Sequence, residues 1–161
     1  MSAAKIKIRP VNASDLDAIN TIISSCVMGW NLPERVKRLS IGSYQYNDHD
    51  LQHLQLFVAL DSANRILAVS ALEEADISDL PDAQTGLLLH GLYVLPDCQK
   101  QGIGNQLIQL AMEKVREKQL DGLLVKAQAD ANSYFQKQGF SLLPVVNHNK
   151  DYPHRWWKTA A

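Results

Sequence analysis

Hydrophobic and polar positions recur along the chain with two periods, one typical of strands and one typical of helices. Residues 5–9 alternate, which predicts a half-buried strand closed by Pro10. Ser14 and Asp17 resemble a capping box that opens a helix, and Gly29 is expected to end it. A short second helix is expected after residue 33. The apolar residues at helical spacing are Leu16, Ile19, Ile22, Ile23 and Val27 in the first helix, and Leu32, Val36 and Leu39 in the second.

The middle of the chain has the pattern of strands. Residues 54–60 and 65–72 are apolar runs separated by the turn-rich segment 61–64, which predicts a hairpin. A polar, acidic loop is expected over residues 73–82. Residues 87–95 follow as the strand that the sequence predicts to be the most buried.

The remaining segments complete an α+β pattern. They are an amphipathic helix over 105–118, a strand over 123–127, a helix over 130–138 stopped by Gly139, and strands over 140–146 and 155–159. The order mixes a hairpin meander with helix-linked crossovers. It predicts one domain over residues 1–161, with about four helices and a mixed, mostly antiparallel sheet of about seven strands.

Composition narrows the functional classes. A chain of 161 residues with 46% hydrophobic and 20% charged residues is typical of one globular domain. The net charge of −1 disfavours nucleic acid and anionic membranes as partners. The N-terminus lacks the apolar stretch of a signal peptide, so a cytoplasmic protein is expected. Cys26 and Cys98 have no metal-type spacing, and two free thiols and no metal are expected. A homodimer is left open.

The segment from Gln99 to Gly104 lies between the buried strand and the amphipathic helix. Two glycines two residues apart allow a tight turn in which successive backbone N–H groups converge. The helix expected to start near Asn105 adds its first amides and its dipole, and Lys100 adds a positive charge. The segment therefore predicts a site for an anion such as a pyrophosphate, against the alternative of an ordinary strand-to-helix turn. Leu107 stands where a dinucleotide fingerprint has its third glycine.

Three motifs occur in a fixed order around this loop: the strand end Leu92-x-Val94-x-Pro, the loop Gln-x-x-Gly-x-Gly, and the helix end Phe135-x-x-x-Gly-Phe. With them the chain resembles the GCN5-related N-acetyltransferases (GNAT). The resemblance implies that acetyl-CoA is the co-substrate and that backbone groups at Leu92 and Val94 bond its pantetheine arm and thioester oxygen. It further implies a pyrophosphate cradle of Gln99, Lys100, Gln101, Gly102, Ile103, Gly104 and Asn105, and a cofactor contact at Gln128.

The same resemblance indicates candidate catalytic residues. Many members carry a Glu where this chain has Leu88, whereas His90 matches one of two histidines of arylalkylamine N-acetyltransferases. An imidazole titrates in the range needed to accept an amine proton. The alternative is a buried histidine bonded to a backbone carbonyl. Members of the family usually have a tyrosine that acts as general acid at the position where this chain has Phe135. The neighbouring Tyr134 is therefore either the proton donor or a packing residue.

The expected function is therefore acetyl transfer from acetyl-CoA to a primary amine of a small molecule or peptide, by direct attack and without a metal. The alternative is a catalytically idle acyl-CoA-binding module that senses a ligand or binds a partner.

Overall fold

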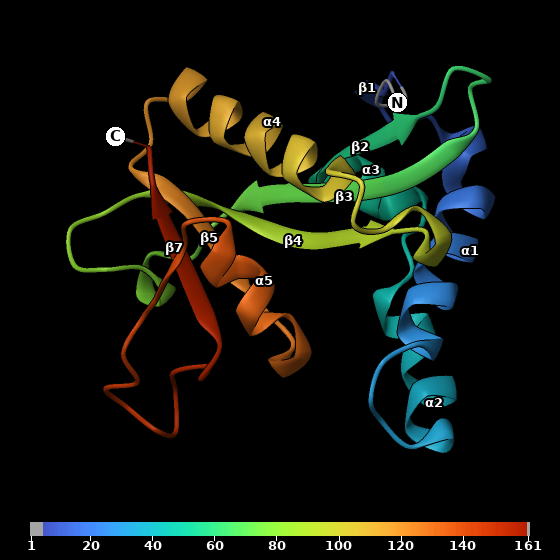
Figure 1. The fold of residues 1–161 in the computed structure, drawn as a ribbon. Coiled ribbons are helices and arrows are strands. Elements are labelled where there is room, and N and C mark those ends of the chain that lie inside the picture. Colours follow the sequence, from blue (N-terminus) through green and yellow to red (C-terminus); the bar gives the residue numbers. More distant parts are fainter. Residues whose placement is uncertain (1–4, 161) are drawn as a thin grey trace. The chain divides into compact units, whose positions relative to one another are not determined.

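A computed structural model describes residues 5–160 (Figure 1). Its seven strands form one sheet in the order β1-β2-β3-β4-β5-β7-β6. Strands β4 and β5 are parallel, whereas β1 pairs with β2, and β7 with both β5 and β6, in antiparallel fashion. The predicted α+β class with a mixed, mostly antiparallel sheet is confirmed.

The elements follow the predicted order. The strands are β1 Lys7–Pro10, β2 Gln55–Leu60, β3 Ile66–Glu74, β4 Gly86–Val94, β5 Gly122–Lys126, β6 Ser141–Leu142 and β7 Arg155–Thr159. The α-helices are α1 Leu16–Met28, α2 Glu34–Tyr44, α3 Asp48–His53, α4 Ile103–Glu117 and α5 Asn132–Lys137, and the 3-10 helices are η1 Ala13–Asp15, η2 Ile77–Asp79, η3 Pro96–Cys98 and η4 Ala129–Ala131. The described residues thus hold five α-helices rather than about four. The short α3, capped by Asn47, was not predicted.

The chain divides into two compact units. The first comprises the chain up to Ala71 together with Gly91–Leu107, and the second comprises Leu72–His90 together with the chain from Ile108 onward. Strands β3 and β4 and helix α4 run from one unit into the other. The organisation as one domain over residues 1–161 stays a prediction.

The core of the first unit lies between α1 and the sheet. Helix α1 buries the predicted stripe of Ile19, Ile22, Ile23 and Val27. These side chains pack in one cluster with residues of the strands and of the segment after α2. The other buried members are Tyr46, Leu56, Val58, Leu60, Val69, Ala71 and Tyr93. The cluster connects the end of β4 to α1, because Tyr93 of β4 packs in it together with the buried side chains of α1.

The start of the first helix differs from the prediction. Asn12, not Ser14, precedes the first turn, and its N–H donates to the Asp15 carboxylate at 2.8 Å. Arg9 donates to the same carboxylate with both terminal nitrogens, at 2.7 and 3.0 Å, and these bonds lower the pKa of Asp15. Asp15 satisfies the same three-residue spacing as the predicted pair and also reaches a cation on β1. A capping box is present, as predicted, but it lies two residues earlier in the sequence than Ser14 and Asp17.

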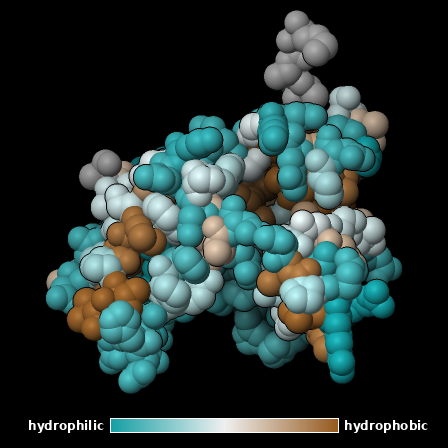
Figure 2. Space-filling view, turned by 60° about the horizontal axis from the view of Figure 1, so that its bottom comes forward, coloured by the Kyte–Doolittle hydropathy of each residue, from teal (hydrophilic) through white to brown (hydrophobic). Residues whose placement is uncertain are grey.

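Helix α2 buries a charge and exposes apolar residues. Lys37 is 7% exposed, and its Nζ donates to the carbonyl of Met28 at 2.7 Å and lies 3.1 Å from Glu34. Val36 and Leu39 are 44% and 75% exposed. In Figure 2 the exposed hydrophobic residues form small brown areas on a mostly hydrophilic surface. Helical spacing alone therefore predicted the helix but not its buried face.

The second unit is built around β5 and β7, with α5 beside them (Figure 1). Trp156 and Trp157 are each 6% exposed, and Nε1 of Trp156 donates to Asn132 at 2.8 Å. The ring of Trp157 lies on two glycines: a Cβ at Gly86 or Gly122 would come within 2.9 or 2.6 Å of it. The sequence predicts strand residues there, but only the packing explains why both must lack a side chain.

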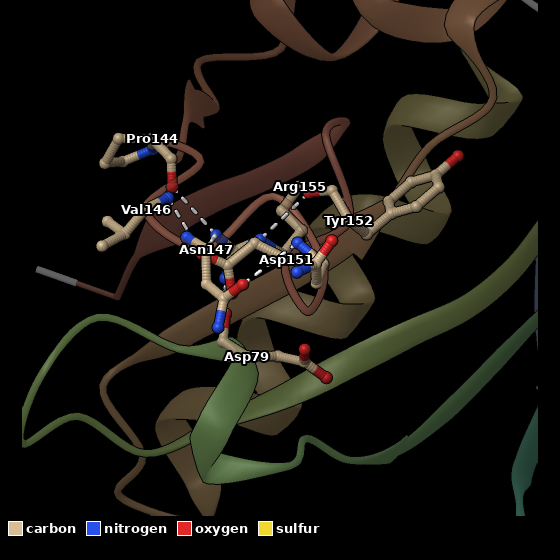
Figure 3. Close-up of polar contacts among 8 residues, drawn as sticks. Asp79, Pro144, Val146, Asn147, Asp151, Tyr152 and Arg155 are labelled. Atoms are coloured by element: carbon tan, nitrogen blue, oxygen red, sulfur yellow. Dashed lines mark hydrogen bonds and ion pairs between the residues drawn. The ribbon is translucent and has the colours of Figure 1, made fainter.

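The predicted strand 140–146 is only two residues long, because the chain after it is held by Arg155 instead of by a ladder (Figure 3). The buried guanidinium donates to the carbonyls of Asp79, Pro144 and Tyr152 at 2.8, 3.0 and 3.2 Å. Asp151 lies 3.6 Å from it and accepts hydrogen bonds from the backbone amides of residues 146 and 147. One arginine thus orders the connection between β6 and β7.

Candidate functional site

Strand β4 carries one residue more than its partner β3. In the second unit the N–H of Ala75 donates to Gly86 at 3.0 Å, and in the first the N–H of Leu95 donates to Leu67 at 2.9 Å. Between these bonds β3 advances eight residues and β4 nine. A single extra residue on one strand of an antiparallel pair is a β-bulge, and it reverses which edge the later residues face.

Gly91 and Tyr93 lie on one face of β4, since a Cβ on Gly91 would lie 2.8 Å from the ring of Tyr93. The N–H of Leu95 points to β3, so the backbone groups of Val94 and Leu92 point to the opposite edge. The register of β4 with β5 covers only Gly86 to Leu89. The two residues predicted to bond the pantetheine arm thus share one edge of β4.

The predicted pyrophosphate loop contains two residues in the left-handed region. Lys100 has a φ of 65° and Gly102 a φ of 83°. Such residues turn successive N–H groups toward one point and form an anion-binding concavity. Helix α4 begins at Ile103, two residues earlier than expected, and its first N–H-to-C=O bond runs from Gln106 to Gly102 at 3.1 Å. Two left-handed residues directly before a helix N-terminus are an arrangement that can bind an anion, and the pyrophosphate site stays a prediction.

Gly104 has a different role from Gly102. It lies in the first turn of α4 and is helical, so the left-handed conformation expected of the loop belongs to Gly102 and to Lys100. At Gly102 an added Cβ would meet no atom within 4 Å. The requirement for glycine there is conformational rather than steric.

Gln99 connects the loop to the strand. Its side-chain amide donates to the carbonyl of Val94 at 3.1 Å, and the thiol of Cys26 donates to the same oxygen at 3.2 Å. Partial burial raises the pKa of Cys26 to about 11, so the thiol keeps its proton and remains a donor at neutral pH. The carbonyl expected to bind the pantetheine arm is therefore already held by two side chains of the protein.

The other candidate residues belong to the second unit. His90 is exposed rather than buried, and its role as a base stays a prediction. Gln128 is also exposed and precedes η4. Tyr134 is half-buried, which raises its pKa, and its ring meets Phe135 edge-on at 5.2 Å. Phe135 is 6% exposed, so the position of the family's usual tyrosine holds a core residue.

The sequence left open whether Tyr46 faces an acceptor site or lies in a surface loop. The residue is 4% exposed, and a Cβ on Gly91 would clash with its hydroxyl oxygen. The signal in the sequence was Gly91 itself, because a glycine inside a strand marks the close approach of another group. Which group approaches was not readable from the pattern, since Tyr46 lies 45 positions upstream of Gly91.

Within residues 5–160, no helix has the length and apolar character needed to cross a bilayer. In the same part of the chain, His, Cys, Asp and Glu side chains do not gather in groups of three or more that could hold a metal ion.

The family model described as "Acetyltransferase (GNAT) domain" matches residues 52–142, more than half of the chain. The chain belongs to the GNAT acetyltransferase family. No curated protein matches the sequence.

Solved structures share the fold at low sequence identity. The PaiA N-acetyltransferase of Thermoplasma acidophilum, in complex with coenzyme A, has a TM-score of 0.74 at 14% identity over 96% of this chain and 99% of its own. A GCN5-related N-acetyltransferase of Rhodopseudomonas palustris has a TM-score of 0.74 at 16% identity, covering 99% and 98%. AtaT complexed with acetyl-methionyl-tRNAfMet has a TM-score of 0.65 at 16% identity, covering 96% and 95%.

Proposed function

We propose that this protein transfers the acetyl group of acetyl-CoA to a primary amine of a small molecule or peptide. The observation that carries the proposal is the loop Gln99–Gly104, in which two left-handed residues precede α4 directly after β4. An anion bound there would accept hydrogen bonds from the N–H groups of the loop and of the first turn of α4. The diphosphate of coenzyme A is such an anion, and the Thermoplasma relative is a coenzyme A complex.

The edge of β4 supports the same ligand. Leu92 and Val94 present their backbone groups away from β3, so an extended chain with amide groups can add there as a strand does. Pantetheine is such a chain. With its phosphates at the loop after Val94, its acyl end would lie toward Gly91 and His90.

The chemistry forms a C–N bond between the amine and the acetyl carbon and breaks the C–S bond, and the proton lost by nitrogen ends on the thiol. His90 is the proposed base, because it immediately precedes Gly91 on β4 and its imidazole is exposed and can accept a proton. Tyr134 remains the proposed proton donor to sulfur. Its half-buried phenol has a raised pKa and keeps its proton at neutral pH, as a donor must.

Release of free thiol from acetyl-CoA tests the proposal. The acceptor panel comprises polyamines, arylalkylamines, amino acids and peptides, with aminoacyl-tRNA added because AtaT, a relative of the same fold, is complexed with acetyl-methionyl-tRNA. Acceptor-dependent thiol release with a small amine or peptide supports the proposal. Release with aminoacyl-tRNA alone would overturn the proposed acceptor class but not acetyl transfer.

A second candidate is an idle acyl-CoA-binding module. Two observations favour it: Leu88 stands where many members carry a catalytic Glu, and Phe135 is buried where they carry the tyrosine. Tight binding of coenzyme A by calorimetry, with no turnover of any acceptor, would support the module.

A further inference from the structure

We propose that copies of this chain associate through two unlike surfaces, the outer face of α2 on one copy and the loop between β3 and β4 on another. The first surface, named the basic face, consists of Arg35, Val36, Arg38 and Leu39. The second, named the acidic loop, is the segment 73–82. The inference does not depend on the proposed function, because no ligand takes part in the contact.

The orientation of α2 is fixed by its inner side. Lys37, Ile41 and Tyr44 follow one another at spacings of four and three residues, so they share one side of the helix. Ile41 and Tyr44 pack against the core cluster, and the buried Lys37 donates to the last carbonyl of α1 at 2.7 Å. The outer side therefore carries Val36 and Leu39, which are three residues apart and 44% and 75% exposed.

Positive charge surrounds these two apolar side chains. Arg35 and Arg38 are exposed, and Glu34 is the one acidic residue of α2. With Lys37 the helix has three cations and one carboxylate, which is a net charge of +2. An aliphatic pair flanked by guanidinium groups fits a partner that is apolar at its centre and acidic at its rim.

The acidic loop has this composition. Ile77, near its middle, is 69% exposed. The loop contains no Lys, Arg or His, and its carboxylates are Glu73, Glu74, Asp76, Asp79 and Asp82. Lys126 pairs with Asp79 at 2.8 Å, so the other four carboxylates give the loop its negative charge.

The acidic loop is also held in one conformation. Ala75 and Leu80, on either side of Ile77, are buried in a small cluster with Leu124 and Trp157. The carbonyl of Asp79 accepts a hydrogen bond from the buried Arg155 at 2.8 Å. A surface that is already ordered loses little conformational entropy on association, so a small contact can be stable.

Charge decides between like and unlike pairing. Two basic faces would bring a charge of +2 against +2, and two acidic loops would bring carboxylates against carboxylates. Like charges brought together at an interface cost free energy, whereas opposite charges favour association. The favoured contact therefore joins a basic face to an acidic loop, with Ile77 of one copy against Val36 and Leu39 of the other.

Sedimentation velocity of the full chain over a concentration series up to about 0.5 mM tests the proposal, since contacts of this size are weak. The wild type is expected to self-associate. Raising the salt from about 0.05 to about 0.5 M should weaken the association at least about fivefold, because salt screens the charges. Leu39→Asp on the basic face and Ile77→Lys in the acidic loop should each weaken it at least about tenfold. Leu142→Asp is the control: this residue of β6 is 53% exposed and outside both surfaces, and its variant should associate as the wild type does.

Mixing the two weakened variants distinguishes this contact from other modes of association. Leu39→Asp keeps an intact acidic loop and Ile77→Lys an intact basic face, so their equimolar mixture should form heterodimers although each variant alone does not associate. A wild type that stays monomeric throughout the series, or a mixture without heterodimers, would overturn the inference. So would an Ile77→Lys variant that still associates, since basic faces would then pair with each other, or a Leu142→Asp variant that does not associate. None of these outcomes bears on coenzyme A binding or acetyl transfer.

Discussion

The side chain of Gln99 reaches back five residues and donates to the carbonyl of Val94 at 3.1 Å. Val94 is the last residue of β4, and Gln99 is the first residue of the loop that leads into α4. The bond fixes the distance between the strand edge and the left-handed turn. A ligand that spans both, as an extended arm with a diphosphate would, meets them already in place.

Gln99→Leu is expected to weaken coenzyme A binding about threefold to tenfold. The variant keeps the size of the side chain and removes one hydrogen bond, which is worth roughly 0.5–1.5 kcal/mol. Calorimetry with coenzyme A measures the effect. Gln109→Leu, on the exposed side of α4, is the control and should bind as the wild type does. Equal affinity of Gln99→Leu and wild type would show that the loop does not depend on this bond.

Gly102→Val is expected to reduce coenzyme A affinity by at least about tenfold. The cause is the φ of 83°, since a residue with a Cβ loses roughly 1–2 kcal/mol in the left-handed region and a β-branched residue more. Gly42→Ala adds a Cβ in α2, where no atom lies within 4 Å, and should have no effect on binding. Gly104→Val is expected to act differently, through the crowding of the first turn of α4. Wild-type affinity of Gly102→Val would remove the loop from the site.

His90→Ala is expected to lower the acetylation rate by roughly 10²–10⁴-fold with coenzyme A affinity close to wild type. Turnover with one amine acceptor and calorimetry with coenzyme A, on the same preparation, measure the two effects separately. If the variant retains near-normal turnover at neutral pH, the proton of the attacking amine is accepted by water or by another group.

Asp15→Asn is expected to destabilise the fold by about 1–2 kcal/mol at neutral pH, since the start of α1 loses its charged acceptor. In the wild type the bonds from Arg9 hold the pKa of Asp15 below its ordinary 3.8. The contribution is therefore complete above pH 3.8 and is lost as pH falls through the lowered value of the folded state. Denaturant titrations at pH 7 and pH 3 measure both effects. Asp17→Asn, one residue into α1, is the control and should change neither.

Arg155→Leu is expected to cost about 3 kcal/mol or more in unfolding free energy, because three carbonyls lose a buried donor and Asp151 loses its cation. Thermal denaturation measures this loss. Arg116→Leu, in the exposed last turn of α4, is the matched control. If Arg155→Leu melts as the control does, the connection between β6 and β7 is held by other contacts.

The periodic segments of this protein were predictable because their evidence is local. The buried stripe of α1, the strands β2 to β5 and the apolar face of α4 follow from spacings within one element, and all lie where the pattern predicts them. The turn before α4 was predictable in part for the same reason: Gly102 is left-handed, as expected of a glycine in a tight turn. Gly104, however, lies in α4, and the second left-handed residue is Lys100. The family resemblance rests on this stretch, and the match of the GNAT family over residues 52–142 confirms it.

The tertiary structure decided what depends on partners distant in sequence. It made Phe135 a core residue, and it made Lys37 rather than Leu39 the buried residue of α2 through a bond to Met28. The bulge in β4 arises from pairing with β3. The contact of Tyr46 with Gly91 arises because the segment after α2 packs into the core cluster, where Asn20 of α1 binds the Tyr46 backbone. Such contacts reflect the space and the hydrogen-bond partners left by other elements, and no spacing within one segment encodes them.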